Sequence, residues 1–372
     1  MGFYMKERKK ILFVTHNPQN ESDGVWKKIK YQVRALRNLQ MDVDFFHLSQ
    51  HKTVILDNQK SQVDILSNAK LKFLFYYYVS RKIESTYNIL YIRKPHGGLY
   101  SLFLLFLIRK VKKLNPNCYV YIEVPTFPYD KEIKGIKDYI SEACFRLTLP
   151  LSISQVDEIL YIGEKTDCIW GVKARQISNG INLEDNPMVA TKYGHSGNFE
   201  FVGVAHLAFW HGYDRLIKSM SEYTGERQII FHIVGGGEPE LTRLKKIVEG
   251  CSLEGKVIFH GKLQGLELTT VLSHADVCVD SLGRHRSGNN INNSIKSKEY
   301  TARGLPFIKS HIDNSFGDER FIYQISADEN VFSIEEIINW RESLGDKVRD
   351  EERTYAINNL TWEKQFGFID NQ

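Results

Sequence analysis

The stretch KSKEYTARGLP, residues 296–306, holds the side chains of this sequence that best suit chemistry on an anionic ligand. Lys296, Lys298 and Glu299 fall in the first turns of an expected helix that begins at Ser294 or nearby and stops at the GLP sequence. A buried-strand pattern, ADVCVDSLG, and a polar loop, RHRSGNNINN, come before it. In an α/β protein this order places a basic loop and a helix N-terminus at the carboxyl edge of a parallel sheet. Backbone N–H groups and the helix dipole favour anions there.

The elements that would position this stretch form two successive series of strand and helix patterns. The first series has strands at KILFVT, MDVDFFHL, NILYIRK, CYVYIEVP and EILYIG, with helices expected over 24–39, 70–85 and 99–113. The second has strands at NFEFVGV, QIIFHIVGGG, KVIFHG, ADVCVDSL and PFIKS, with helices expected over 212–223, 238–249 and 266–273. Two such arrays with right-handed crossovers predict an α/β protein of two doubly wound, Rossmann-like domains that face a cleft.

Length and composition fit this expectation. The chain has 372 residues, which favours two domains, and it is 42% apolar and 25% charged, as in soluble globular proteins. Its five cysteines are scattered, which argues against a disulfide framework or a zinc site and for a reducing, cytoplasmic location. The N-terminus has no signal-peptide order, and the apolar run 99–108 is too short to span a bilayer.

The positive charge is unevenly placed. Between Lys70 and Lys113 ten basic residues stand against one acid, Glu84, so this segment carries +9 and the rest of the chain −5, for a total of +4. The segment is also rich in aromatic residues, as in FLFYYYV. Such a stretch suits peripheral contact with an anionic membrane surface, and two ordinary helices with solvated lysines explain it equally well.

The second half of the chain carries a family likeness. The ordered series VGV, HGYDRLI, FHIVGGGEPELTRL, VIFHG, LSHADVCVDSL and KSKEYTARGLPFI resembles the C-terminal half of family-4 retaining glycosyltransferases, which have the GT-B fold. The TW of NNLTWEKQF resembles the helix with which that family crosses back to its N-terminal domain. In the first half, YIEVPTFPYDKE resembles a segment of bacterial surface-polysaccharide transferases. The resemblance implies an acceptor-binding domain over 1–190, a nucleotide-sugar-binding domain over 191–350 and a returning C-terminal helix over 351–372.

The likeness also implies roles for residues in the second half. Glu299 matches the glutamate that binds the ribose hydroxyls, and a carboxylate suits two neighbouring O–H groups. Lys296, with the Asn293-Ser294-Ile295 backbone, would contact the diphosphate, so no metal or other cofactor is expected. Lys262 and Leu263 occupy the base-binding position. Each residue has an ordinary alternative as a surface side chain.

Two departures from the family pattern stand out. A glutamate that usually contacts the donor sugar is replaced by Ile291, flanked by Asn290 and Asn292. An arginine and a lysine usual in the first loop of the domain are replaced by Val204 and His211. Arg284, Arg286 or Arg215 would supply the lost charge, and His211 would donate a hydrogen bond to phosphate.

The loops that follow other strands complete the candidate set. In the Gly235–Gly237 turn we expect Gly236 and Gly237 to approach the donor most closely, although a plain tight turn also explains them. In the first half, Gly24 would let the backbone meet the donor phosphate or the acceptor. No general base is identified. The candidates at expected strand ends are His16, His96, Glu123 and Thr126.

The sequence therefore predicts a retaining, metal-independent glycosyltransferase. It would move a sugar from a UDP- or GDP-sugar to a glycan or lipid-linked acceptor in surface polysaccharide synthesis, in the cytoplasm at the inner face of the membrane, without a nucleic-acid partner. A retaining transfer tolerates the missing base, because the departing phosphate can take the acceptor proton. The alternatives are a non-catalytic GT-B-like partner subunit and a sugar-nucleotide epimerase.

Overall fold

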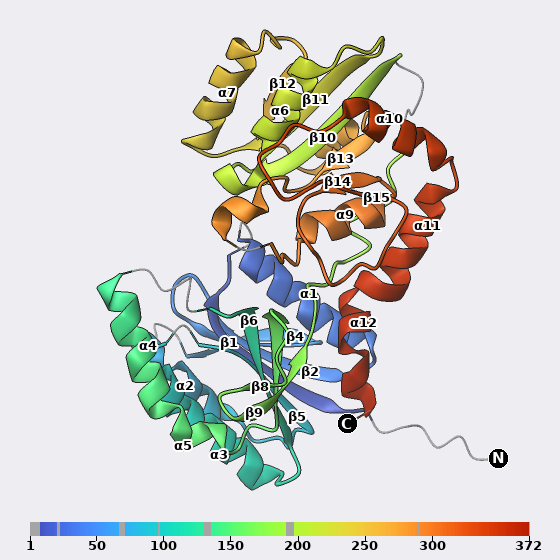
Figure 1. Cartoon of the computed structure of the whole chain (residues 1–372). Coiled ribbons are helices and arrows are strands. Elements are labelled where there is room, and N and C mark those ends of the chain that lie inside the picture. The colour runs from blue at the N-terminus through green and yellow to red at the C-terminus, as the bar shows by residue number, and fades with distance from the viewer. Residues whose placement is uncertain are drawn as a thin grey trace, which may run out of the picture. The chain divides into compact units, whose positions relative to one another are not determined.

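The computed structural model describes residues 8–20, 23–66, 71–95, 97–129, 135–190, 197–288 and 290–371. The chain forms two compact units (Figure 1). Unit 1 comprises Met1–Ser178 and Trp362–Gln372, and unit 2 comprises Asn179–Thr361. The division lies before the expected boundary at residue 190, because Ile181 and Val189 hydrogen-bond to Leu360 and Arg303 within unit 2. The return to unit 1 likewise begins at Trp362 and not at residue 351.

Unit 1 is built on a mixed sheet in the order β4-β3-β2-β1-β5-β6-β7-β9-β8. The central strands from β2 to β9 run parallel, while β3, β4 and β8 pair antiparallel at the two sides. The strand bounds are β1 Lys10–Pro18, β2 Asp42–Leu48, β3 Val54–Asn58, β4 Ser61–Leu66, β5 Ile89–Arg93, β6 Tyr119–Phe127, β7 Glu158–Gly163, β8 Cys168–Ile169 and β9 Val172–Gln176.

Helices cover both faces of this sheet. One face packs against α1 (Gly24–Asn38) and the C-terminal α12 (Trp362–Phe366), in a core that includes Trp26, Leu36 and Trp362. The other face packs against α2 (Phe75–Lys82) and α3 (Tyr100–Leu114), beside which lie α4 (Ile136–Thr148) and α5 (Pro150–Ile153). The burial of Trp362 explains why the TW pair marks the returning helix.

Unit 2 has a parallel sheet in the order β12-β11-β10-β13-β14-β15. Numbered from the first strand of the unit, this is the 3-2-1-4-5-6 order of the doubly wound dinucleotide-binding fold. The bounds are β10 Asn198–His206, β11 Gln228–Gly236, β12 Val257–Gly261, β13 Val277–Val279, β14 Phe307–Lys309 and β15 Ile322–Gln324. Residues from α6 (Tyr213–Glu222), α7 (Glu240–Gly250) and α10 (Ile334–Ser343) cover one face, and residues from α8 (Gly265–Leu272), α9 (Ile295–Arg303) and α11 (Val348–Tyr355) cover the other.

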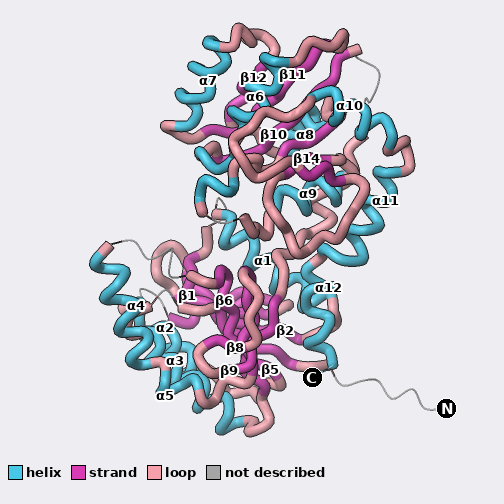
Figure 2. The backbone as a smooth tube through the Cα atoms, viewed as in Figure 1, coloured by secondary structure: helices cyan, strands magenta, loops and turns pink. Residues whose placement is uncertain are grey.

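The expected fold class is confirmed: both units are doubly wound α/β structures, with helices on both faces of the sheets (Figure 2). Differences lie at the periphery of the sheets. The hairpin β3–β4, the helices α4 and α5, and the short strands β8, β9 and β15 were not expected. The C-terminal region 334–366 is divided into α10, α11, a π-helical segment Ala356–Leu360 and α12. None of the described helices is long and apolar enough to cross a membrane.

Candidate functional site

The candidate site lies in unit 2, where β10 and β13 are neighbours and the order of strands reverses. In doubly wound sheets, ligands bind outside the carboxyl ends of the strands at this point. The backbone N–H of Leu282, after β13, donates to the carbonyl of His211, after β10, over 2.8 Å. Gly212 permits the approach, because a Cβ there would lie 2.3 Å from the nitrogen of Gly283. The two loops are therefore held together at the edge of the sheet.

The helix α9 begins beside these loops. Ser294 is its N-cap, as expected, and its hydroxyl accepts from the N–H of Ser297. The N–H groups of Ile295 and Lys296 occupy the first positions of the helix, where no intrahelical acceptor exists. The buried ammonium of Lys298 holds the preceding turn by donating to Asn293 Oδ1, the Ser294 carbonyl and Asp313 Oδ2, at 3.1 to 3.2 Å. Lys298 thus holds the turn that precedes α9 in place.

Lys296 is paired within the chain. Its Nζ lies 2.9 Å from Oδ1 of the fully buried Asp280, which follows β13. Burial by itself raises the pKa of Asp280, but the charges of Lys296 and His311 and the hydroxyls of Ser294 and Ser297 hold it below its usual value. Asp280 is therefore ionised and compensates the charge of Lys296. The sequence reasoning missed Asp280, although a carboxylate at the end of a buried strand pattern was a usable signal.

His211 is a neutral hydrogen-bond donor in this geometry. Burial, and after it the charge of Lys296, lower the pKa of His211 to about 3. The N–H of Ala208 donates to Nδ1 of the ring over 3.0 Å. A neutral imidazole that accepts at Nδ1 carries its proton on Nε2. Nε2 has no partner among the described residues, so its N–H is available to an oxygen at the edge of the sheet.

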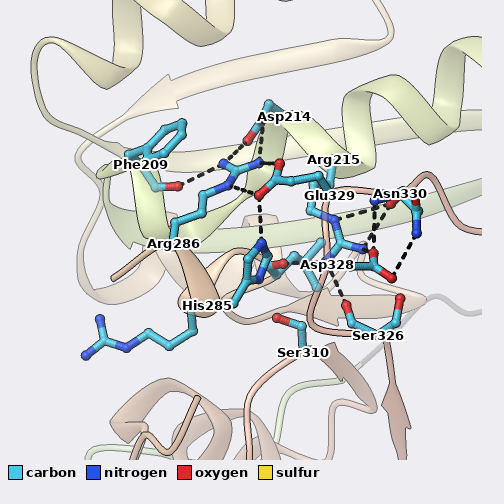
Figure 3. A network of polar contacts seen from close by, with 12 residues as sticks. Phe209, Asp214, Arg215, His285, Arg286, Ser310, Ser326, Asp328, Glu329 and Asn330 are labelled. Carbon is cyan, nitrogen blue, oxygen red and sulfur yellow. Dashed lines mark hydrogen bonds and ion pairs between the residues drawn. The ribbon is translucent and has the colours of Figure 1, made fainter. Parts of the chain in front are cut away.

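Two of the three candidate arginines form hydrogen bonds within unit 2 through all the N–H groups of their guanidinium groups. Arg286 donates to Asp214, Glu329 and the carbonyl of Phe209, and these bonds engage every N–H of its guanidinium (Figure 3). The guanidinium of Arg215 is likewise saturated. Its acceptors are Asp328 and the carbonyls of Leu282, Ser326 and Asn330. Neither Arg215 nor Arg286 retains a free N–H among the described residues, which disfavours their predicted contact with the donor phosphate.

Arg284 remains. Its Nε has no hydrogen-bond partner, and the side chain forms no ion pair, within the described residues. Burial lowers its pKa, and the charge of Asp280 opposes the shift. The guanidinium lies 6.0 Å from the ring centroid of the exposed Trp210. Of the three arginines, Arg284 alone has donors available for an incoming anion.

The end of β11 and the residue after it supply close backbone approach. A Cβ on Gly235 would lie 1.8 Å from the carbonyl oxygen of Ala205, and one on Gly237 would lie 2.6 Å from that of Leu207. Gly235 is required where the ends of β10 and β11 pair, and Gly237 where the chain after β11 passes the segment after β10. Gly236 has open space in front of it, since no atom lies within 4 Å of its would-be Cβ. Lys262 is exposed and Leu263 half-buried directly after β12, the strand next to β11.

The remaining candidates of unit 2 have mixed positions. Glu299 is half-buried one turn along α9 from Lys296, and its ribose-binding role stays a prediction. Asn293 is occupied structurally, because its side chain accepts from Asn179 N–H and donates to Ser315 Oγ. Asn290 and Ile291 are fixed through backbone pairing with Ile312, on the segment after β14.

Val204 is held at the strand switch. Its backbone N–H donates to the hydroxyl of Tyr300, which itself donates to the carbonyl of Val279 on β13. This bridge ties β10 to β13 through a side chain of α9. The backbone N–H of Val204 therefore makes a structural contact that does not depend on the side chain at this position.

In unit 1 the structure removes one candidate base. Glu123 was expected at a strand end but lies fully buried within β6. Its carboxylate accepts from Gln32, Tyr91 and Arg93 and lies 3.3 Å from Lys28 Nζ. Burial raises the pKa of Glu123, but the charges of Lys28 and Arg93 outweigh this and lower it. Glu123 is a structural ion-pair centre.

The other candidates of unit 1 stay predictions or fall outside the structure. His16 is buried after the core of β1, with Nδ1 3.3 Å from the hydroxyl of Tyr76, and Thr126 is exposed near the end of β6. Gly24 opens α1 with free space around it, but Asp23 caps that helix start with a carboxylate, which disfavours an anion there. His96 lies outside the described residues.

Comparisons with known proteins agree with this geometry. Residues 191–285 match the family of glycosyl transferases group 1. The whole fold is similar to a glycosyltransferase from Rickettsia africae (TM-score 0.62, 14% identity, 98% of each chain covered) and to sucrose-phosphate synthase from Thermosynechococcus elongatus (0.59, 14%, 98% of each). It is also similar to Anabaena HepE in complex with UDP (0.58, 11%, 97% of this chain and 98% of that one). A search of curated proteins finds no match.

At these identities the structural likeness shows the fold, which is GT-B. The group 1 match in unit 2, taken with this fold, makes the chain an enzyme of the glycosyltransferase class.

Proposed function

We propose that this chain is a retaining, metal-independent glycosyltransferase that uses a UDP- or GDP-sugar. One observation carries the proposal: the strand switch of unit 2 brings together the N-terminus of α9, the unpaired Arg284 and the Nε2–H of His211. Each is a donor without an acceptor in the described part of the chain, and a nucleoside diphosphate is an acceptor-rich anion.

The donor grip follows from these positions. The N–H groups of Ile295 and Lys296 and the helix dipole would face the diphosphate, and Arg284 would supply the positive charge. Lys296 adds a donor but little net charge, because Asp280 compensates it. Glu299 would hold the ribose hydroxyls. The open space at Gly236 would admit the nucleotide to the backbone of the β11 loop.

In the proposed transfer these residues stabilise the leaving group. As the bond from the sugar to the diphosphate breaks, negative charge grows on the phosphate oxygen and strengthens its hydrogen bonds to the α9 N–H groups, Arg284 and His211. His211 is neutral, so it donates without titrating at physiological pH. The departing phosphate takes the acceptor hydroxyl proton. No protein base is then required. This agrees with the position of Glu123, whose carboxylate is held by Lys28 and Arg93 in a buried ion-pair network.

The acceptor and the cellular setting are inferred from features of the sequence. We infer a glycan or lipid-linked acceptor in surface polysaccharide synthesis from the resemblance of the 121–132 segment to such transferases. We also infer a reducing, cytoplasmic location from the scattered spacing of the five cysteines. Ile291 in place of a carboxylate indicates that the donor sugar is recognised through apolar contact or the flanking asparagines.

A non-catalytic GT-B-like subunit is the second candidate, and one observation favours it. The edge of the sheet has little uncompensated charge, since Arg215, Arg286 and Lys296 are all paired internally. Such a subunit would bind nucleotide weakly or not at all.

Release of UDP or GDP from a panel of sugar nucleotides, with and without a chelator, tests the proposal. We expect slow hydrolysis of at least one donor that survives chelation. Calorimetry that finds no binding of any UDP- or GDP-sugar would leave the subunit role, and hydrolysis abolished by the chelator would refute metal independence.

A further inference from the structure

The helix α4 turns its apolar side outward. Ile136, Ile140, Ala143 and Leu147 follow one another at helical spacing, and all four are exposed. Ile136 is 79% exposed, Ile140 60% and Leu147 80%, while the side that packs against unit 1 holds Glu142 and Phe145. This is the reverse of the polarity expected for a helix on the surface of a protein in water.

Neighbouring side chains extend the apolar surface. Leu151, at the start of α5, is 50% exposed. An aromatic strip runs from Phe73, in the turn before α2, through Phe103 and Phe106 on α3 to Tyr77 on α2, with ring centroids 5.6 to 6.1 Å apart from one to the next. Figure 1 shows α2, α3, α4 and α5 grouped on one side of the unit 1 sheet. The exposed apolar side chains of α4 and α5 together with this strip are called the outer face below.

Unpaired cations lie at the ends of the same helices. Along α3 the line continues from Phe106 to the exposed Arg109 and Lys113 and the half-buried Lys110. On α2, Tyr77 is followed one turn later by Arg81 and Lys82. None of these five basic residues forms an ion pair within the described residues. The sequences of α2, α3 and α5 contain no acid. Of the two acids on α4, Glu142 is buried and held by Arg146 and Lys94, which leaves Asp138 as the exposed one.

We propose that the outer face is the surface by which this chain lies on an anionic lipid bilayer. An apolar stripe bordered by aromatic rings and cations matches the layering of a membrane interface, where acyl chains meet negatively charged headgroups. A protein partner would also cover apolar side chains, but it would not require unpaired basic residues at the ends of two helices. The bilayer is therefore the occupant that the charges favour.

This inference relocates the membrane contact expected from the sequence. The basic segment 70–113 supplies the cations and the aromatic strip, whereas the deepest apolar contact comes from α4, outside that segment. The outer face lies in unit 1 and shares no residue with the nucleotide-binding loops of unit 2. The proposed membrane binding and the proposed donor binding can therefore be tested and refuted independently of each other.

Vesicle flotation of the full-length protein tests the proposal. The vesicles are phosphatidylcholine alone or an equal mixture of phosphatidylcholine and phosphatidylglycerol. We expect the protein to float with the anionic vesicles and more weakly with the neutral ones. The double variant Ile140→Glu/Leu147→Glu should lose at least about tenfold in partitioning, because each side chain removed from water contributes that much or more. Arg109→Gln and Lys113→Gln should each cost about fivefold on anionic vesicles only.

A matched control is available in unit 2. Leu266 is 81% exposed on α8, so Leu266→Glu adds one of the two charges of the double variant at the exposure of Leu147 and should float like the wild type. Thermal unfolding and nucleotide binding of the double variant should match the wild type, since the replaced side chains face solvent. Flotation unchanged in the double variant would overturn the proposal. So would light scattering that shows a wild-type dimer dissociated by Ile140→Glu/Leu147→Glu, because the outer face would then join two copies of the chain.

Discussion

Arg284 and Arg286 stand two residues apart, and the structure predicts opposite consequences when each is replaced by alanine. Arg284 forms no ion pair in the described part of the chain, and the charge of Asp280, beside the proposed phosphate site, acts on it. Arg286 is buried and bonded to Asp214 and Glu329. Arg284→Ala should therefore reduce nucleotide binding and leave stability almost intact, whereas Arg286→Ala should destabilise unit 2.

The magnitudes follow from these contacts. One hydrogen bond to a charged group contributes about 1.5–3 kcal/mol, so Arg284→Ala should weaken UDP or GDP binding by roughly 10- to 150-fold. Its loss of stability should be about 1 kcal/mol at most, from the contact with Trp210. Breaking the buried Arg286–Asp214 pair should cost about 3 kcal/mol, at the low end of such changes because Arg243 still lies 3.0 Å from Asp214. That cost lowers the melting temperature by roughly 6–12 °C.

Calorimetry with UDP and GDP, and thermal unfolding of both variants and the wild type, give the two readouts. The nucleotide affinity of the wild type should fall as the salt concentration is raised, and that of Arg284→Ala should fall less. Equal nucleotide affinity in Arg284→Ala and the wild type would refute the role of Arg284. A normal melting temperature in Arg286→Ala would show that the network of Figure 3 is not structural.

Three further predictions use single substitutions. Glu299→Ala should weaken nucleotide binding by roughly 2–5 kcal/mol through the lost ribose hydrogen bonds, and an unchanged affinity in calorimetry would exclude that role. Gly235→Ala should destabilise unit 2 by about 3 kcal/mol, because its Cβ would meet the carbonyl of Ala205, while Gly236→Ala should keep the melting temperature and lose nucleotide affinity. The reverse pattern would contradict the assignment of open space to Gly236. Asp276 is buried, and burial raises its pKa to about 6, so the folded state binds its proton more tightly than the unfolded state does. The stability it contributes is complete below about pH 4 and lost as the pH rises through 6. Asp276→Asn should therefore be more stable than the wild type by about 2–3 kcal/mol at pH 8 and no more stable at pH 4, and equal denaturant midpoints at pH 8 would contradict the shift.

Local patterns along the sequence were sufficient for the order of the elements. The alternation of apolar strands and amphipathic helices predicted both doubly wound units, and Ser294 was identified as an N-cap because a serine hydroxyl there can accept the N–H three residues on. The α4 helix was missed although Ile136, Ile140, Ala143 and Leu147 follow one another at helical spacing. That spacing indicates a helix, but it does not show whether the apolar side faces the core or the solvent. The hairpin β3–β4 was missed because β4 is largely exposed and weakly apolar.

The residues of the candidate site were predicted less completely than the fold, because the sequence does not show which charged side chains pair with one another. Sequence reasoning recognises a basic residue but not its partner, so Arg215, Arg284 and Arg286 were equivalent until the structure paired two of them. Glu123 carried a usable signal: a carboxylate between apolar neighbours on both sides of a strand pattern is buried, and a buried carboxylate needs cationic partners such as Lys28 and Arg93.

Hydrogen exchange of the wild-type protein with and without UDP or GDP tests the central claim most directly, because it locates the nucleotide. The account predicts slower exchange in segments 207–212, 234–238 and 282–303 of unit 2 when the nucleotide binds. Protection confined to other segments, or saturating nucleotide with no change in exchange anywhere, would contradict it.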